Sequence, residues 1–331
     1  MVIKRRERDD LLKCYWRNKR GSTLVLTAIA LPVLLGFGAL AIDMGMLYVT
    51  RTQLSSAADA AAYGGGGQLP KDANQALTVA KNVAKKNGVT DSEMVISVSS
   101  STAGLNNGSI TVDISRKVPL MLAPVLGLNS SIVAAHAKAE VAPSGTVPWI
   151  VPFVLPRTTQ FDYTSRFTMR VRGDWTNPEL HELDYMNVKI NAAQSYRDYL
   201  NYLKGGYKEG FTVGNDMQYY APSSGGPDSV KAFKERVTND PNTDYKKAKV
   251  GDPRVMLIPL VESMLPRNTR EGRSMKIVGF VAFYLESVTP NNYYETYFAQ
   301  GRFLDNLNIG PGNWSTNTDE DFGCYAVKLV E

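Results

Sequence analysis

The sequence has few of the side chains that most often carry enzyme chemistry. It contains two histidines and two cysteines in 331 residues, and it has no G-x-S-x-G, H-E-x-x-H or P-loop motif. Cys14 precedes a long apolar run and Cys324 lies near the far end of the chain, so a membrane would separate them and we expect no disulfide within the chain. His136 lies among alanines in an alternating segment and is expected to be structural or at the surface. The sequence therefore predicts a protein that is not an enzyme and needs no cofactor.

Candidate metal ligands are also sparse. His181 has acidic neighbours and is a weak candidate. Three residues have the spacing that begins a calcium-binding loop: Asp240, Asn242 and Asp244. Tyr245 stands at the glycine position of such a loop and Gly251 at the position of the bidentate glutamate, so the loop is incomplete. A turn rich in Asp and Asn accounts for the same residues, and a metal-dependent adhesin or hydrolase stays the least favoured alternative.

Beyond its first 22 residues, the chain has no excess of positive charge. Residues 1–22 contain eight basic and three acidic side chains, and the remaining chain has 29 of each sign. A nucleic-acid groove would need basic residues distributed through the fold. The sequence therefore predicts no nucleic-acid partner, and its net charge of +5 is a short basic tail.

The longest uncharged stretch follows this tail. Thr23 to Ile42 contains 20 residues without a charge, about 30 Å of helix and enough to cross the hydrocarbon core of a bilayer. The positive flank predicts a cytoplasmic N-terminus, with Asp43 onward outside the membrane. A cleavable signal peptide is the alternative, because residues 39–41 have the A-x-A form.

Small and apolar residues continue at helical spacing beyond this stretch, to the glycines at 64–67, which we expect to end the helix. The sequence thus predicts one continuous helix, a transmembrane span followed by an amphipathic stalk. Residues expected to anchor the helix or pack against other helices are Gly21, Pro32, Gly38, Ala41, Asp43, Gly45, Leu54, Ala58 and Ala61. Asp43 is expected at the outer membrane interface.

An ordered set of residues in this region resembles the N-terminus of TadE/TadG-like proteins of bacterial Tad (Flp) pilus systems. The set consists of Arg20, Gly21, Pro32, Asp43, Gly45, Arg51, Leu54, Ala57, Ala58, Asp59, Ala60 and Ala61. Segments 195–217, 252–263 and 276–286 are also similar to longer members. The resemblance implies a membrane-spanning envelope protein that accompanies pilus assembly and has no known enzymatic chemistry. Prepilin-type processing would cut between Gly21 and Ser22, although Leu26 stands where major pilins carry glutamate.

Beyond the stem, residues 71–87 predict an amphipathic helix, and 94–100, 109–115 and 131–141 predict three antiparallel strands. Residues 142–148 read as a linker. Later segments predict strands and two short helices, with Val255 to Val261 and Ile277 to Leu285 as central strands. The predicted fold class is α+β: a long N-terminal transmembrane and stalk helix, a small helix-plus-antiparallel-sheet module, then a β-rich mixed extracytoplasmic domain. The predicted division is 1–22 (tail), 23–63 (helix), 68–142 (module) and 148–331 (β-rich domain).

Together these features predict a membrane-anchored structural component of a Tad-type pilus system. Its expected partners are the lipid bilayer and other pilus-assembly or pilin subunits, met through the N-terminal helix. The expected location is the bacterial cell membrane, with the C-terminal domain outside. The alternative is a processed, pilin-like subunit that polymerises through the same helix in a surface filament.

Overall fold

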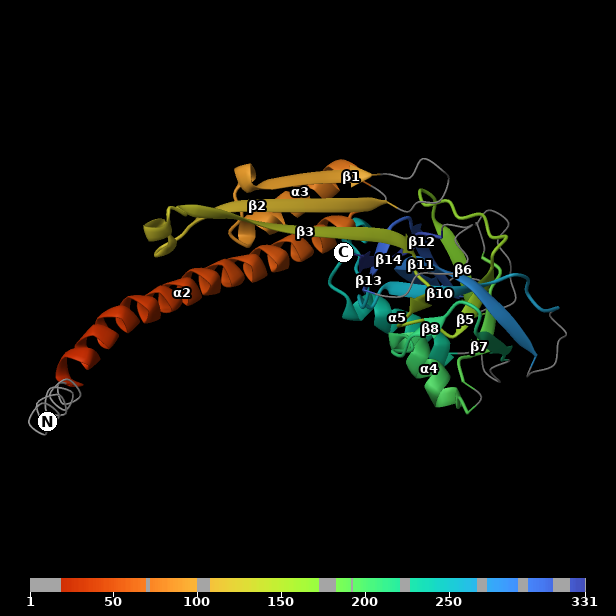
Figure 1. Ribbon diagram of the computed structural model, residues 1–331. Helices are drawn as coiled ribbons and strands as arrows, with labels where there is room; N and C mark the ends of the chain where they lie inside the picture. Colours follow the sequence, from red (N-terminus) through yellow and green to blue (C-terminus); the bar gives the residue numbers. More distant parts are fainter. Residues whose placement is uncertain are drawn as a thin grey trace, which may run out of the picture.

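The computed structural model describes residues 19–69, 72–99, 108–172, 183–191, 193–220, 227–266, 273–290, 297–311 and 322–330. It shows the predicted α+β architecture, with a β-rich C-terminal part. A long helix, α2, leads from the N-terminal end into a sheet that lies along its second half (Figure 1). A rounded body of strands and shorter helices lies beyond the C-terminal end of α2 (Figure 1).

Helix α2 spans Lys19–Gly66, 48 residues, and contains Pro32. The prediction of one continuous helix is confirmed, and its length is about 72 Å at the usual rise per residue. The end point differs from expectation, because Gly64, Gly65 and Gly66 form the last helical turn. They let other elements approach closely: a Cβ on Gly65 would lie 2.5 Å from Ile110 Cδ1 and 2.9 Å from the carbonyl oxygen of Ala76.

The module beside α2 contains one further helix and a sheet. Helix α3 (Ala73–Lys86) begins at Asp72, whose side chain accepts a hydrogen bond from the Gln75 N–H. The predicted strands are present as β1 (Met94–Ser99), β2 (Ser109–Pro119) and β3 (Ser130–Pro143), paired antiparallel in that order. Short 3-10 turns η1 (Asp91–Glu93) and η2 (Ala123–Leu126) precede β1 and β3.

Two strands from the C-terminal end of the chain complete this sheet. Strand β14 (Cys324–Leu329) pairs antiparallel with β3, and β13 (Leu307–Pro311) pairs parallel with β14. The sheet order is therefore β1-β2-β3-β14-β13. The division between residues 142 and 148 stays a prediction, but the two sheets do not separate along it.

One face of this sheet packs on α2 and α3 because apolar residues alternate along the strands. The buried side chains of β2 and β3 are Ile110, Val112, Ile114, Val118, Val133, Ala135, Ala137, Ala139 and Val141. Opposite them lie the alanines of α2 and of α3. Small side chains on both helices allow close contact with the branched side chains of the sheet.

The β-rich part holds a seven-stranded sheet of order β10-β5-β7-β9-β11-β12-β6, in which β10 also pairs with β11. These pairings close a ring of five strands. The elements are β4 (Thr146–Val147), β5 (Phe153–Pro156), β6 (Phe167–Arg172), β7 (Met186–Lys189), α4 (Tyr196–Gly205), β8 (Phe211–Thr212), β9 (Asp216–Tyr219), α5 (Pro227–Asn239), η3 (Tyr245–Lys247), β10 (Val255–Val261), β11 (Ser274–Pro290) and β12 (Tyr297–Leu304).

Strands β10 and β11 are central in this sheet, as predicted from their continuous apolar runs. Every residue of β10 is buried, and β11 pairs with β9, β10 and β12 along its length. Side chains on one face of β10 pack with α4, α5 and a group of aromatic rings, and those on the other face form a second core. Because they are buried on both faces, β10 and the middle of β11 show no alternation of apolar and polar residues.

Candidate functional site at the helical stem

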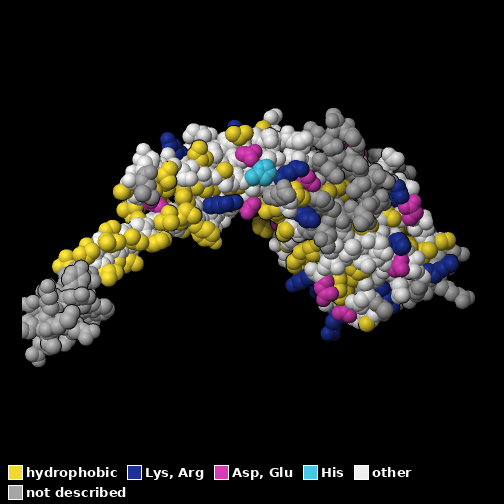
Figure 2. Space-filling view, in the orientation of Figure 1, with side chains coloured by type: hydrophobic (Ala, Val, Ile, Leu, Met, Phe, Trp, Pro, Cys, Tyr) yellow, Lys and Arg dark blue, Asp and Glu magenta, His cyan; other side chains and the backbone are white. Residues whose placement is uncertain are grey.

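The first half of α2 exposes an uninterrupted apolar surface. Its exposed large side chains are Leu24, Val25, Leu26, Ile29, Leu31, Val33, Leu34, Leu35, Phe37, Leu40 and Ile42. The helix is long and apolar enough to cross a membrane, and its most apolar stretch is not buried against any part of the chain that the structure describes. Figure 2 shows hydrophobic side chains covering this half of the helix. A surface of this kind needs lipid or another apolar partner around it.

The small residues predicted for helix packing lie on this uncovered surface. Ala41 is exposed, and a Cβ added to Gly38 or Gly45 would meet nothing within 4 Å. Pro32 is also exposed within the helix. Gly21 and Ser22, the candidate processing site, lie in the first turn of α2. A new N-terminus at Ser22 would therefore leave nearly all of the helix intact.

The second half of α2 is buried within the chain itself. Leu54, Ala58 and Ala61, predicted as a packing face, belong to the core between α2, α3 and the sheet. Their partners include Ala80 of α3 and Ala137 of β3. This face is already occupied within the chain, so it is not open to another subunit.

Asp43 lies at the change between the two halves and is only 3% exposed. Its Oδ1 accepts a hydrogen bond from the Met121 N–H at 2.8 Å. Its Oδ2 accepts bonds from the N–H groups of Leu122 at 3.1 Å and Ala123 at 2.7 Å. These donors begin the connection between β2 and β3, residues 120–129, which we call the tip. The carboxylate thus fixes the tip to the stem with three charge-assisted hydrogen bonds.

Sequence reasoning placed Asp43 at an interface but did not find its partner. The donors are backbone N–H groups that lie 78 to 80 positions further along the chain. Nearly every residue has such a group, so the sequence does not show which ones bind Asp43. Two signals were present. Asp43 is the single charge between Arg20 and Arg51, and the tip is an apolar run that a helix or strand would normally bury.

The candidate calcium ligands form consecutive turns. The Asp240 carboxylate accepts from the N–H of Asn242 at 2.8 Å, the Asn242 side chain accepts from Asp244 at 3.0 Å, and Asp244 accepts from Lys246 at 3.1 Å. These side chains are directed to the backbone, which is the Asx-turn arrangement. Among the residues that the structure describes, no three His, Cys, Asp or Glu side chains are grouped to hold a metal ion.

The two histidines have different outcomes. His136 lies on the exposed face of β3, where its Nδ1 is 2.7 Å from Asp113 Oδ1 on β2. This agrees with the expected surface or structural role. His181 lies outside the described residues.

Two buried arginines hold the β-rich part together and were not predicted. Arg236 of α5 donates to the carbonyl oxygens of Leu203 at 2.5 Å, Pro253 at 2.8 Å and Val255 at 3.2 Å. Arg254 donates to Glu286 at 2.8 Å and Val237 at 3.0 Å, again through carbonyl oxygens. Burial lowers the pKa of Arg236 below its ordinary value. Both side chains are structural ties between α5 and the strands.

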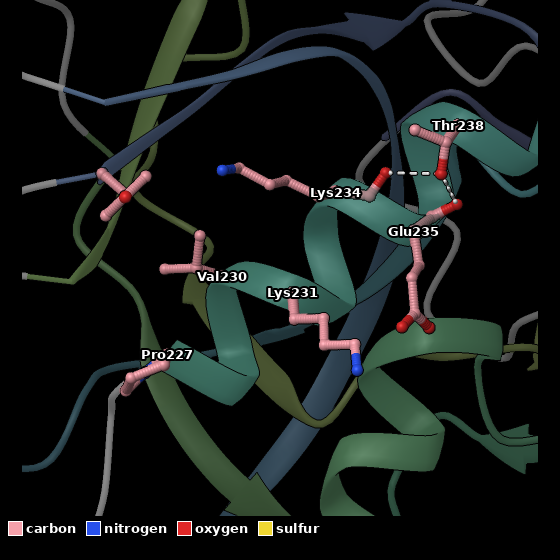
Figure 3. A pocket seen from close by; sticks show the side chains of 7 residues that line it. Pro227, Val230, Lys231, Lys234, Glu235 and Thr238 are labelled. Atoms are coloured by element: carbon pink, nitrogen blue, oxygen red, sulfur yellow. Dashed lines mark hydrogen bonds between the residues drawn. The ribbon is translucent and has the colours of Figure 1, made fainter.

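A cavity of about 300 Å³ lies along α5 (Figure 3), lined by Pro227, Val230, Lys231, Lys234, Glu235, Thr238 and Tyr297. Glu235 pairs with Lys204 at 3.0 Å, and the Lys234 Nζ lies 4.9 Å from the centre of the Tyr297 ring. The Thr238 hydroxyl donates to the carbonyl oxygens of Lys234 and Glu235 (Figure 3). The lining offers no nucleophile beside a general base. The stem, rather than this cavity, is the candidate functional site.

Comparison with known proteins agrees with the geometry of the stem. The family model of Flp pilus-assembly TadE/G-like proteins matches residues 21–68, which are α2 and the turn that follows it. Neither a curated protein nor a solved structure matches the chain. The resemblance seen in the sequence is thereby confirmed for the stem. Residues 21–68 of this chain, the helix that carries the candidate site, are similar to the Flp pilus-assembly TadE/G-like family.

Proposed function

We propose that this protein is a membrane-anchored structural component of a Tad (Flp) pilus-assembly system. The first half of α2 spans the membrane once, with the basic N-terminal tail in the cytoplasm. The module and the β-rich part lie outside the cell membrane. The family match over the stem supports the system, and the exposed apolar half of α2 supports the anchor.

One observation carries this proposal: α2 is a single helix that is apolar and uncovered in its first half and buried in a folded module in its second. A signal peptide has no reason to continue as the core helix of the mature fold. A helix shared by membrane and module holds the two at a fixed distance, since no linker interrupts it. The protein therefore acts as a rigid support, which places its sheet and its β-rich part at a set height above the membrane.

Accessibility to a membrane-impermeant maleimide tests the anchor and its orientation. Single cysteines would replace Lys4 in the tail and Val95, which is exposed on β1, in a full chain with Cys14→Ser and Cys324→Ala. We expect position 95 to react in spheroplasts and position 4 to react only after the membrane is permeabilised. The opposite pattern would reverse the orientation, and recovery of the chain in the soluble fraction would exclude the anchor.

A processed pilin-like subunit is the second candidate, and the open glycines of α2 favour it. Because Gly36, Gly38 and Gly45 leave space around the first half of the helix, another apolar helix can approach closely there. Mass spectrometry of the mature protein separates the two functions. A chain that begins at Met1 supports the retained anchor, whereas one that begins at Ser22 and is recovered in sheared filaments supports the subunit.

A further inference from the structure

The tip exposes apolar side chains that nothing in the described chain covers. They are Met121, Leu122, Val125 and Leu128, and together with the exposed Ile132 near the start of β3 they form what we call the tip patch. Met121 is 70% exposed and Val125 is 89% exposed. Isolated apolar residues are common at protein surfaces, but four in one short connection and a fifth beside it form a patch that needs a partner.

The charge around the tip patch fits a lipid surface. No charged residue occurs between Lys117 and Lys138. Lys117 lies on β2 directly opposite Ile132 of β3 and is exposed. The patch therefore has an exposed basic residue at its border, whereas the acidic residue beside it, Asp43, is buried and hydrogen-bonded, a pattern that suits contact with anionic headgroups.

The position of Asp43 along α2 determines how far the tip lies from the start of the uncharged stretch, and thus its height relative to the membrane. The stretch of α2 from Thr23 to Thr50 has no charge apart from Asp43, and that carboxylate lies beneath the tip. Asp43 follows the first 20 residues of this stretch, about 30 Å along the helix and therefore at the outer boundary of the hydrocarbon core.

Several backbone N–H groups of the tip are hydrogen-bonded within the chain, which suits surroundings with little water. Asp43 accepts the N–H groups of Met121, Leu122 and Ala123. Within the tip, further N–H groups donate to carbonyl oxygens, among them Leu120 to Asn129 and Leu128 to Ala123. Unpaired N–H groups are costly at a membrane boundary, and these pairings remove that cost.

We propose that the tip patch inserts into the outer headgroup boundary of the same bilayer that α2 crosses. The partner is the lipid surface, because Asp43 fixes the tip at the end of the apolar half of α2 and the patch therefore lies at the height of that boundary. This inference rests on the proposed membrane anchor. With α2 as a first attachment, the tip is a second one beside it, and two attachments prevent the rest of the protein from tilting or rotating about the stem.

The test measures the depth of single fluorophores in the membrane. An environment-sensitive dye is attached to Val125→Cys in the full chain with Cys14→Ser and Cys324→Ala, reconstituted in vesicles of phosphatidylethanolamine and phosphatidylglycerol. Nitroxide groups are placed either near the headgroup or deep in the acyl chains. Val95→Cys, exposed to 68% on β1 of the same module, is the matched control, and Leu34→Cys in the span reports the anchor.

We expect the dye at position 125 to shift its emission to the blue and to lose most of its intensity with the shallow nitroxide. The dye at 95 should keep its aqueous emission, and the dye at 34 should be quenched by the deep nitroxide. If 34 is quenched and 125 behaves as 95 does, the tip does not insert although the anchor stands. If neither 34 nor 125 is quenched, the anchor itself is wrong. A blue shift at 125 that depends on protein-to-lipid ratio without nitroxide quenching would assign the patch to a second copy and overturn the proposal.

Discussion

The carboxylate of Asp43 and the backbone N–H of Met121 are 2.8 Å apart, although 78 positions separate them in the sequence. This contact joins the end of the apolar half of α2 to the end of the β2–β3 hairpin. The hairpin therefore runs back along the stem toward the exposed apolar half of α2 (Figure 1). The same carboxylate also accepts from Leu122 and Ala123, so the loss of one side chain should release the whole connection.

Replacing Asp43 with alanine should open the tip without unfolding the module. A hydrogen bond to a charged group contributes roughly 2 kcal/mol. If the variant loses the free energy of only one such bond, local opening at Met121–Ala123 should become about 30-fold more frequent. Hydrogen exchange of these amides measures it. Asp59→Ala, further along the same helix, is the control. Equal exchange in both variants would show that Asp43 does not hold the tip.

Replacing Gly65 with alanine should destabilise the module. The new Cβ would lie 2.5 Å from Ile110 Cδ1 and 2.9 Å from both the Ala76 carbonyl oxygen and the Ala80 Cβ. Overpacking of this kind costs about 1–3 kcal/mol. The matched control is Gly45→Ala, because a Cβ there meets nothing within 4 Å and alanine favours the helix. Denaturant unfolding in detergent measures both, and a stable Gly65→Ala variant would contradict the packing of the last turn.

Acid should weaken the module through Glu93. Arg116 donates to both carboxylate oxygens, at 2.6 and 2.9 Å, and lowers the pKa of Glu93 from 4.5 to about 2. A lowered pKa in the folded state means that this stabilisation is complete above pH 4.5 and is lost as the pH falls toward 2. The thermal midpoint of the wild-type chain should therefore fall more steeply over this range than that of Glu93→Gln. Glu140→Gln, which removes a partly exposed pair with Lys138, should keep the wild-type slope.

Replacing Arg236 with methionine should destabilise the β-rich part. The variant leaves the carbonyl oxygens of Leu203, Pro253 and Val255 without the donor that they share. Buried carbonyls without partners cost about 2 kcal/mol or more in total. Lys231→Met changes an exposed cation on the same helix and should be nearly neutral. Unfolding followed by tyrosine fluorescence checks the difference, and similar midpoints for the two variants would exclude a structural role for Arg236.

The elements of the stem and module could be predicted because their signals are local. The apolar run predicted α2, helical spacing of alanines predicted α3, and alternation predicted β2 and β3. Gly65 was misread as part of a stop signal. Glycine usually ends a helix. Here glycine is required because Ile110 packs closely against this position, and the local sequence does not show such a tertiary contact.

The remaining parts depended on contacts between distant segments. Strand β14 pairs with β3, Val327 opposite Val141, and such pairings leave no periodic mark in either segment. The apolar residues of the tip can be read in the sequence, but it does not show that their side chains stay exposed while the backbone binds Asp43. Arg236 looked like any charge on an amphipathic helix, because its burial is imposed by α4 and β10.

The place of β14 between β3 and β13 has a consequence for the order of folding. The sheet that packs on α2 lacks the strand between β3 and β13 until residues 324–329 are present. These residues are synthesised after the entire β-rich part. Until this strand is added, β3 has an unpaired edge that other chains or proteases can recognise. Because β14 pairs with β3, the sheet beside α2 is complete only when the C-terminal end of the chain has folded onto it.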